Sequence, residues 1–460
     1  MKRLPFDFIR STAFIWLALF APVGAVAGDT FSPGATRKIQ FSTGTSYNYI
    51  SQSYYQTIAD TALDLGSSLN QEYLNQPGVF LKMTTTPFGD RRLQLESYLE
   101  QSTDYFRGRF NSDVSLRSAT ERFTFSSSLE LRRRTQGQVQ IGDDYITGRA
   151  RMKWSHAISK RVQPFVSVTG EFNTLDNSNL SDTSAIAFGN GYQRATAQGG
   201  IGIDIGKLDR LIISGAFESR TVPTDTSLAY QLGRAEIEYT GFLSSSFYSL
   251  NLSMDNRNYN IAGDDNDQIW LRLGGSAQFD LSSRFAIEPR LEVEGINYRM
   301  DTSSFNLDQT RIEGQMKFLV RVGSATIGIG PHFEGLTQVA PPATATTSPT
   351  AADALDSALL VSVEDLSEAY FESATVISFE YFTLSSLMMN LENQFGLRDY
   401  DVENSFQTDY AFNRLSLFST MRIAGNIKFD IIGSIEWEWH DQQFDNNTFY
   451  LLNSSLSYGF

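Results

Sequence analysis

Charged side chains recur at every second position in several segments of this chain. Arg149, Arg151 and Lys153 are separated from one another by single uncharged residues. A β-strand places alternate residues on the same face, so these three cations would form one row. Such a row can attract anionic groups or guide ions, provided that its face of the strand is wet. The spacing therefore predicts a strand with one charged, solvated face and one apolar face.

The same alternation occurs in four further segments, which predicts a barrel whose polar parity lines the lumen. The candidate lumen-lining residues are Glu130, Arg132, Arg134, Arg149, Arg151, Lys153, Glu288, Arg290, Glu292, Glu294, Arg311, Glu313, Lys317, Arg321, Glu392 and Arg398. These charges could border a water-filled conduit, or they could pair across the strands and fill the interior. The sequence is compatible with both arrangements together.

Strands must position these side chains, and the period-two pattern runs almost without interruption from Lys38 to the C-terminus. Short connections such as Gly323-Ser324 alternate with longer ones, which is typical of outer-membrane barrels with short periplasmic turns and long outer loops. We expect an all-β, single antiparallel transmembrane up-and-down barrel over 28–460, with twenty strands and eighteen as the alternative. The early strands are expected near 38–51, 78–88, 92–105 and 110–119.

Residues 1–27 have the pattern of a secretory signal peptide. Lys2, Arg3 and Arg10 precede an apolar stretch, and Ala25-Val26-Ala27 is a small-residue cleavage pattern. No other segment is a continuous apolar run long enough for a membrane-spanning helix, so a membrane form of the chain would cross as strands. Export followed by removal of this peptide would place the protein in the cell outer membrane.

Composition excludes several other classes of site and partner. The chain has no cysteine, which excludes disulfides and thiolate metal sites. Its formal net charge of −15 disfavours nucleic acid as a partner. We therefore expect no cofactor and no metal site.

Two long extracellular loops are expected at 52–77 and 340–367. Both contain apolar residues that would be poorly placed in water, such as Ile58 and Leu63 in the first and Leu359 and Leu360 in the second. We expect one or both loops to fold into the barrel mouth and narrow it. A surface loop with a short helix is the alternative.

Evidence for catalysis is weak. The three histidines, His156, His332 and His440, are far apart in the sequence, and only His440 has an acidic neighbour, Asp441. Without a recognisable nucleophile beside it, His440 does not indicate a catalytic arrangement. The chain is therefore not expected to be an enzyme.

The last strand carries apolar residues on one parity and ends on an aromatic. Leu456, Tyr458 and Phe460 share that parity with Tyr450 and Leu452. This pattern resembles the C-terminal assembly signal of Gram-negative outer-membrane β-barrels, and the whole chain from residue 28 resembles porin-like members of that class. The segments 76–81 and 89–95 also resemble the opening hairpins of β-barrel porins found with polysaccharide-export systems.

These resemblances imply a porin-like channel for passive passage of small hydrophilic solutes. An outer-membrane conduit or accessory barrel for exopolysaccharide secretion is the second interpretation, and a non-conducting structural or enzymatic barrel is the third. The implied partners are outer-membrane lipid, lipopolysaccharide and the barrel-assembly machinery. The second interpretation adds polysaccharide-export components.

Overall fold

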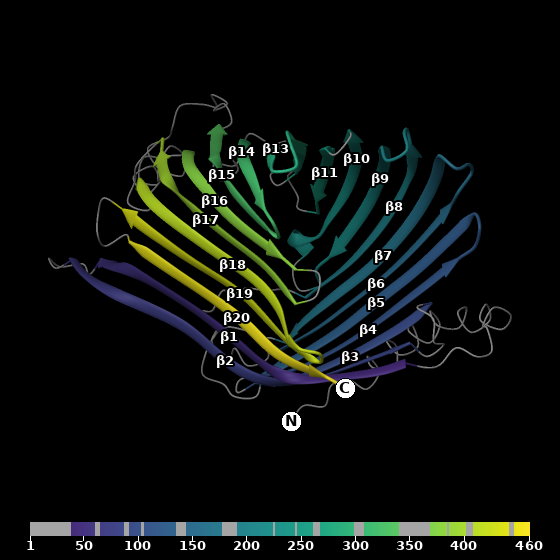
Figure 1. Cartoon of the computed structure of the whole chain (residues 1–460), viewed down its shortest axis with the longest axis horizontal. Helices are drawn as coiled ribbons and strands as arrows, with labels where there is room; N and C mark the ends of the chain where they lie inside the picture. The colour runs from purple at the N-terminus through teal and green to yellow at the C-terminus, as the bar shows by residue number, and fades with distance from the viewer. Residues whose placement is uncertain are drawn as a thin grey trace, which may run out of the picture.

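The chain folds into one closed antiparallel β-barrel of twenty strands (Figure 1). The computed structural model describes residues 38–59, 65–86, 92–102, 105–134, 144–176, 191–223, 226–243, 246–260, 267–298, 308–339, 369–383, 386–401, 408–440 and 446–460. Each strand pairs with its neighbours along the chain, and β1 pairs with β20. The expectation of twenty strands is thereby confirmed.

The described residues are almost entirely strand. The strands are β1 (Lys38–Ala59), β2 (Leu65–Thr86), β3 (Leu93–Ser102), β4 (Tyr105–Arg117), β5 (Glu121–Arg134), β6 (Asp144–His156), β7 (Val162–Asp176), β8 (Tyr192–Asp204), β9 (Arg210–Thr221), β10 (Tyr230–Leu243), β11 (Ser246–Tyr259), β12 (Gln268–Asp280), β13 (Phe285–Tyr298), β14 (Asp308–Val322), β15 (Ala325–Val339), β16 (Tyr370–Phe382), β17 (Leu387–Tyr400), β18 (Tyr410–Ala424), β19 (Ile427–His440) and β20 (Asn447–Gly459). A 3-10 turn, η1 (Thr226–Leu228), precedes β10. No helix in these ranges is long and apolar enough to cross a membrane.

Alternation of side chains explains why these segments become strands of a barrel. In β15, Ile327, Ile329 and Phe333 are exposed on one face, whereas His332 and Glu334 lie on the other. The β-branched and aromatic residues favour the pleated conformation and suit an apolar outer surface. Because every strand has two paired neighbours, closure leaves no open sheet edge along the wall.

A two-residue turn joins β14 to β15. Val322 pairs with Ala325, which leaves Gly323 and Ser324 as the turn, and Gly323 has a φ of 62°. Glycine adopts this left-handed conformation without a steric cost, so the residue type fits the turn.

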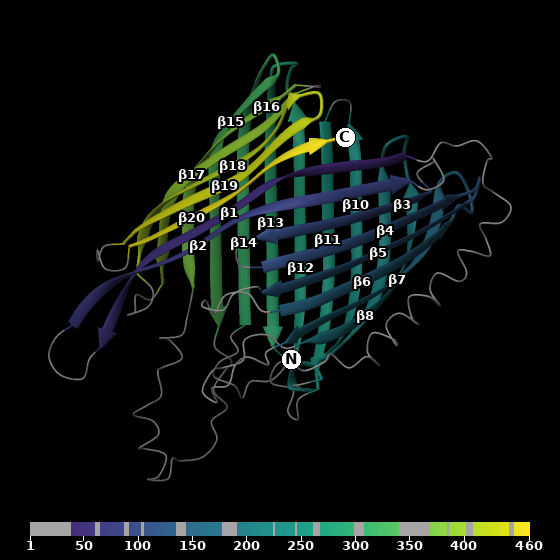
Figure 2. The ribbon, with the colours of Figure 1, turned by 90° about the horizontal axis from the view of Figure 1, so that it is seen from below.

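The first hairpin differs from the sequence prediction. Residues 52–77 were expected to form a long loop, but β1 continues to Ala59 and β2 begins at Leu65, with Ala59 paired to Leu65. The loop interpretation is therefore wrong for 52–59 and 65–77. The alternation is hard to recognise there because this ribbon extends beyond its neighbours, where no lipid-facing parity is required (Figure 2).

The pairing limits show how far the ribbon extends. β1 pairs with β20 only up to Tyr54, and β2 pairs with β3 only from Gly78. The expected boundary near 106–109 is also displaced, because β3 ends at Ser102 and β4 begins at Tyr105. The other expected loop, 340–367, and the signal peptide, 1–27, lie outside the described residues.

The barrel closes where its last strand meets its first. The backbone nitrogen and oxygen of Phe41 bond to the oxygen and nitrogen of Phe460 at 3.1 and 2.8 Å. Their rings stack with centroids 5.8 Å apart. In both views, purple β1 lies between β2 and yellow β20 (Figures 1 and 2). The final residue is thus an integral part of the barrel wall.

Candidate functional site

The polar parity of the strands faces the lumen. Arg414 on β18 reaches Glu372 on β16, and Lys317 on β14 reaches Glu392 on β17, so both contacts pass over intervening strands. Side chains converge in this way on the concave face of a curved sheet and diverge on the convex face. The opposite parity carries the exposed apolar side chains and forms the outer surface.

An ionic girdle lines the lumen, to which every strand from β4 to β19 contributes. In much of the wall, acids on odd-numbered strands alternate with arginines on even-numbered strands. The girdle consists of Arg107, Arg109, Glu130, Tyr145, Arg149, Glu171, Arg194, Glu218, Tyr230, Arg234, Asp255, Arg272, Glu294, Arg311, Glu334, Tyr370, Glu372, Arg398, Arg414 and Glu436.

Strand register produces this girdle. Glu171 lies directly opposite Arg194, Arg272 opposite Glu294, and Glu294 opposite Arg311. Residues in direct register have Cβ atoms about 5 Å apart, so opposite charges there meet without strain. The girdle therefore links neighbouring strands through their side chains as well as through the backbone.

Glu372 is the most enclosed acid of the girdle, with a side chain that is 0% exposed. Its Oε2 accepts hydrogen bonds from Nε and Nη2 of Arg398 at 3.0 and 2.6 Å. Its Oε1 accepts from Arg414 Nη1 at 3.0 Å and from Gln394 Nε2 at 3.1 Å. Both carboxylate oxygens are thus saturated by donors from β17 and β18.

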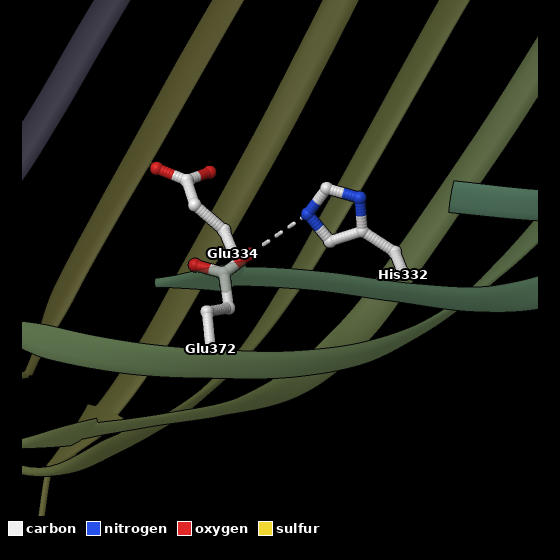
Figure 3. A group of neighbouring side chains, drawn as sticks. All are labelled: His332, Glu334 and Glu372. Carbon is white, nitrogen blue, oxygen red and sulfur yellow. Dashed lines mark ion pairs between the residues drawn. The ribbon is translucent and has the colours of Figure 1, made fainter. Parts of the chain in front are cut away.

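Glu372 also belongs to a cluster with the ligand types of a metal site. One nitrogen of His332 and one oxygen each of Glu334 and Glu372 lie within 4.8 Å of one another. Figure 3 shows the three side chains on the same side of their strands, with the imidazole turned toward Glu372 at 3.7 Å. The sequence did not predict this cluster, because Glu372 is distant in the chain and only strand pairing brings it alongside.

Ion pairing already occupies most of this cluster. Glu334 accepts a hydrogen bond from Arg311 Nε at 2.9 Å and another from the Tyr370 hydroxyl. A cation would have to displace a guanidinium group from Glu372 and would be repelled by Arg398 and Arg414. The cluster therefore serves as a junction of the ionic girdle.

A second junction of the girdle lies on β10 to β12, around Asp255. Asp255 on β11 is 2% exposed and accepts two hydrogen bonds from Arg234, at 2.7 and 2.6 Å. Arg272 adds a third at 3.2 Å. Bidentate pairing of this kind is among the stronger side-chain interactions in proteins.

The candidate luminal residues of β5 and β6 lie on the polar parity. Glu130 bonds to Arg107, Arg109 and Tyr145, and Arg132 stacks over the Tyr105 ring at 4.5 Å. The side chain of Arg134 is outside the described part of the structure. The charges of Arg149 and Arg151 are poorly compensated, because Arg149 lies 4.0 Å from Glu171 and Arg151 bonds to the uncharged Ser167.

The candidate residues of β13, β14 and β17 form smaller groups. Arg290 pairs with Glu292 at 3.2 Å, and Arg311 pairs with Glu313 at 2.9 Å. Lys317 lies 3.7 Å from Glu288 and 3.6 Å from Glu392. Further members of the predicted row are similarly engaged: Glu294 with Arg272, Arg321 with Asp280, and Arg398 with Glu372.

The contact between Lys317 and Glu392 passes over β15 and β16. A Cβ atom added to Gly328 of β15 would come within 2.4 Å of the Ser378 hydroxyl and 2.8 Å of the Leu319 side chain, but only within an ordinary 3.7 Å of the Lys317 side chain. Glycine at this position therefore leaves room for Ser378 and Leu319 beside the lysine. Sequence alternation alone gives no signal for such a long contact.

The girdle contains many residues that the sequence prediction omitted, including Glu171, Arg194, Glu218, Arg234 and Asp255. Each lies on the polar parity of a strand that was itself predicted. Extending the parity rule to every strand would have found them, but their pairing depends on register between strands.

Two features at the strand ends complete the picture. The side chains of Leu456 and Tyr458 on β20, and of Phe460 directly after it, are exposed on one parity. Nδ1 of His440 lies 2.7 Å from the Thr408 hydroxyl, and its ring packs against Tyr410 at 4.7 Å. These contacts hold His440 at the end of β19, and Asp441 lies outside the described residues.

The comparisons with known proteins give no close relative. No family model matches the chain, and no curated protein matches its sequence. Among solved structures, the siderophore receptor PirA from Pseudomonas aeruginosa matches with a TM-score of 0.51 and 8% identity, over 93% of this chain and 81% of that chain. PirA from Acinetobacter baumannii also gives 0.51 and 8%, over 91% and 80%.

OpdL from Pseudomonas aeruginosa matches less well, with a TM-score of 0.46 and 11% identity over 92% of this chain and 98% of that chain. None of the comparisons supports the narrower resemblance to barrels found with polysaccharide-export systems. At these identities the two PirA structures indicate architecture alone. The chain shares the β-barrel fold of these solved proteins.

Proposed function

We propose that the protein is an outer-membrane channel through which small hydrophilic solutes pass by diffusion. The observation that carries this proposal is the division of the wall into a charged inner face and an apolar outer face. On β12, for example, Leu271 and Leu273 are exposed outside, whereas Arg272 joins the girdle inside. An apolar belt suits lipid, and a charged interior suits water.

Closure of the barrel supports the membrane location. Lipid provides no hydrogen-bond partners for backbone groups, so a sheet can span a bilayer only when its first and last strands pair. The pairing of β1 with β20 meets this requirement. Export by the predicted signal peptide and assembly through Leu456, Tyr458 and Phe460 are parts of the same proposal.

A barrel of this strand number is wide enough to hold more than its own side chains. Because the girdle's acids and arginines pair along the wall, they hold one another against the strands. We therefore propose a hydrated lumen bordered by the girdle. Passage of solutes through this lumen does not require an enzyme activity. In the same proposal, residues 340–367 narrow this lumen.

Conductance of the purified full-length protein in planar bilayers tests the proposal. We expect discrete open steps that persist at moderate voltage, and a larger step after deletion of 341–366 if that segment narrows the lumen. Correctly folded protein that never conducts would contradict the channel and leave the non-conducting barrel as the better account. Passage of an anionic polymer, with small solutes excluded, would instead favour the exopolysaccharide interpretation.

A further inference from the structure

We infer that a basin in the luminal wall over β3 to β6 is a binding subsite for small zwitterions whose ammonium and carboxylate groups are close together. This inference deepens the proposed channel function by naming a solute class. The basin comprises Glu96, Asp113, Ser126, Ser128, Arg149 and Arg151 and has a volume of 340 Å³.

Register arranges the basin as two parallel rows. In one row Asp113 on β4 lies opposite Ser126 on β5, which lies opposite Arg151 on β6. In the other, Glu96 on β3 lies opposite Asn111, followed by Ser128 and Arg149. Each row thus has an acid at one end, an arginine at the other end and a serine hydroxyl between them.

The arginine end of the basin keeps most of its positive charge available. The Arg149 side chain is 56% exposed, and its contact with Glu171 is long, at 4.0 Å. Arg151 is exposed and donates from Nε to the Ser167 hydroxyl at 3.2 Å. Lys153, which follows Arg151 on the same face of β6, lies 4.5 Å from the Phe165 ring. A carboxylate would therefore find unneutralised guanidinium donors here.

At the acidic end of the basin, one of the two carboxylates is free to bind a cationic group. Glu96 pairs with Lys82 at 2.8 Å, whereas Asp113 is exposed and forms no ion pair within the described ranges. Nor does an ion pair in those ranges join Asp113 or Glu96 to either arginine. The opposite charges therefore face the same basin without neutralising each other.

The distance between the acidic and the basic end of a row limits the size of the ligand. Asp113 and Arg151 are two strands apart, which separates their backbones by about 10 Å. Two charge-assisted hydrogen bonds of about 2.8 Å leave room between them for only a short molecule. A group such as an α-amino acid backbone fits this arrangement, with its ammonium toward Asp113 and its carboxylate toward Arg149 and Arg151.

The test is ligand-observed NMR titration of the full-length protein in detergent, which does not depend on conductance. Glycine is the zwitterionic probe, and glycolate, glycinamide and acetamide are its anionic, cationic and uncharged counterparts. The variants are D113N and the double variant R149Q/R151Q. R290Q is the matched control, because Arg290 is equally exposed in the lumen at 55% but lies outside the basin.

We expect the apparent Kd for glycine to rise on the order of tenfold in both basin variants, since each loses a charge-assisted contact. Glycolate should weaken only in R149Q/R151Q, and acetamide should bind in none of the proteins. R290Q should retain the glycine affinity of the unaltered chain. R149K/R151K, which keeps the charges, should restore much of the affinity if the double variant has lost it.

Weakening of glycine and glycolate alike in R149Q/R151Q, with neither weakened in D113N, would reduce the basin to simple anion attraction and overturn the inference. Unchanged glycine affinity in D113N would do the same. These results are separable from failure of the channel proposal. Open steps without glycine binding would remove the subsite alone, whereas glycine binding without open steps would remove the channel alone.

Discussion

The junction around Glu372 and the basin around Arg149 use the same types of residue in opposite ways. Glu372 is fully enclosed and accepts hydrogen bonds from two arginines and a glutamine. Arg149 is largely exposed, and its only described ion pair is at 4.0 Å. The difference shows that pairing turns a luminal charge into part of the wall, whereas an unpaired charge remains available to a solute.

The largest effect should follow from removing the acid at the enclosed junction. In E372L, Arg398 and Arg414 would lose a shared partner whose side chain is 0% exposed. Breaking one side of a buried ion pair typically costs about 3–5 kcal/mol. We expect a loss of unfolding free energy in this range, measured by urea titration of the barrel in lipid. E392Q is the control, because Glu392 is 38% exposed and, in the described ranges, forms an ion pair with Lys317 alone.

A smaller loss is expected at the second junction. In D255N the amide would keep the shape of the side chain but lose the charge that holds Arg234 and Arg272. The amide oxygen can still accept a hydrogen bond from Arg234, whereas the leucine of E372L accepts none. We expect a loss of about 2 kcal/mol, in line with hydrogen bonds to charged groups. A loss equal to that of E372L would show that the remaining amide oxygen does not support the two arginines.

The basin should behave differently, because its charges contribute little to the wall. R149Q/R151Q should change the unfolding free energy by less than about 0.5 kcal/mol, as is usual for exposed sites. The same variant should shift the reversal potential of the channel toward cation selectivity in a salt gradient. A loss of stability like that of D255N would show that Arg149 and Arg151 stabilise the wall as Arg234 and Arg272 do.

Salt provides the mildest perturbation. Raising the ionic strength from about 0.1 to 1 M shortens the screening length from about 10 to 3 Å. The selectivity contributed by Arg149 and Arg151 should therefore fall, while the enclosed contacts of Glu372 should hardly change. Reversal potentials and urea midpoints, measured on the same preparation at both salt concentrations, would show whether the two regions respond separately.

The fold could be predicted from the sequence because strand parity is a local property. The alternation around Arg149, for instance, needs no knowledge of the neighbouring strands. The junctions could not be predicted in the same way, because Glu372 meets Arg398 and Arg414 only through the register of three strands. The first hairpin was predicted wrongly for a related reason. Beyond Tyr54, β1 pairs with β2 alone, so it is not part of the barrel wall and its residues need not alternate between apolar and polar.

The pairing of Phe41 with Phe460 has a consequence for the order of folding. These residues are separated by almost the whole described chain, so the contact that closes the wall has a very large sequence separation. Contacts of this kind form slowly, because the intervening chain must be ordered first. Until the last residue arrives, β1 presents an unpaired edge that another chain could occupy. The edge of β1 that pairs with β20 therefore stays open to other strands until β20 has formed beside it.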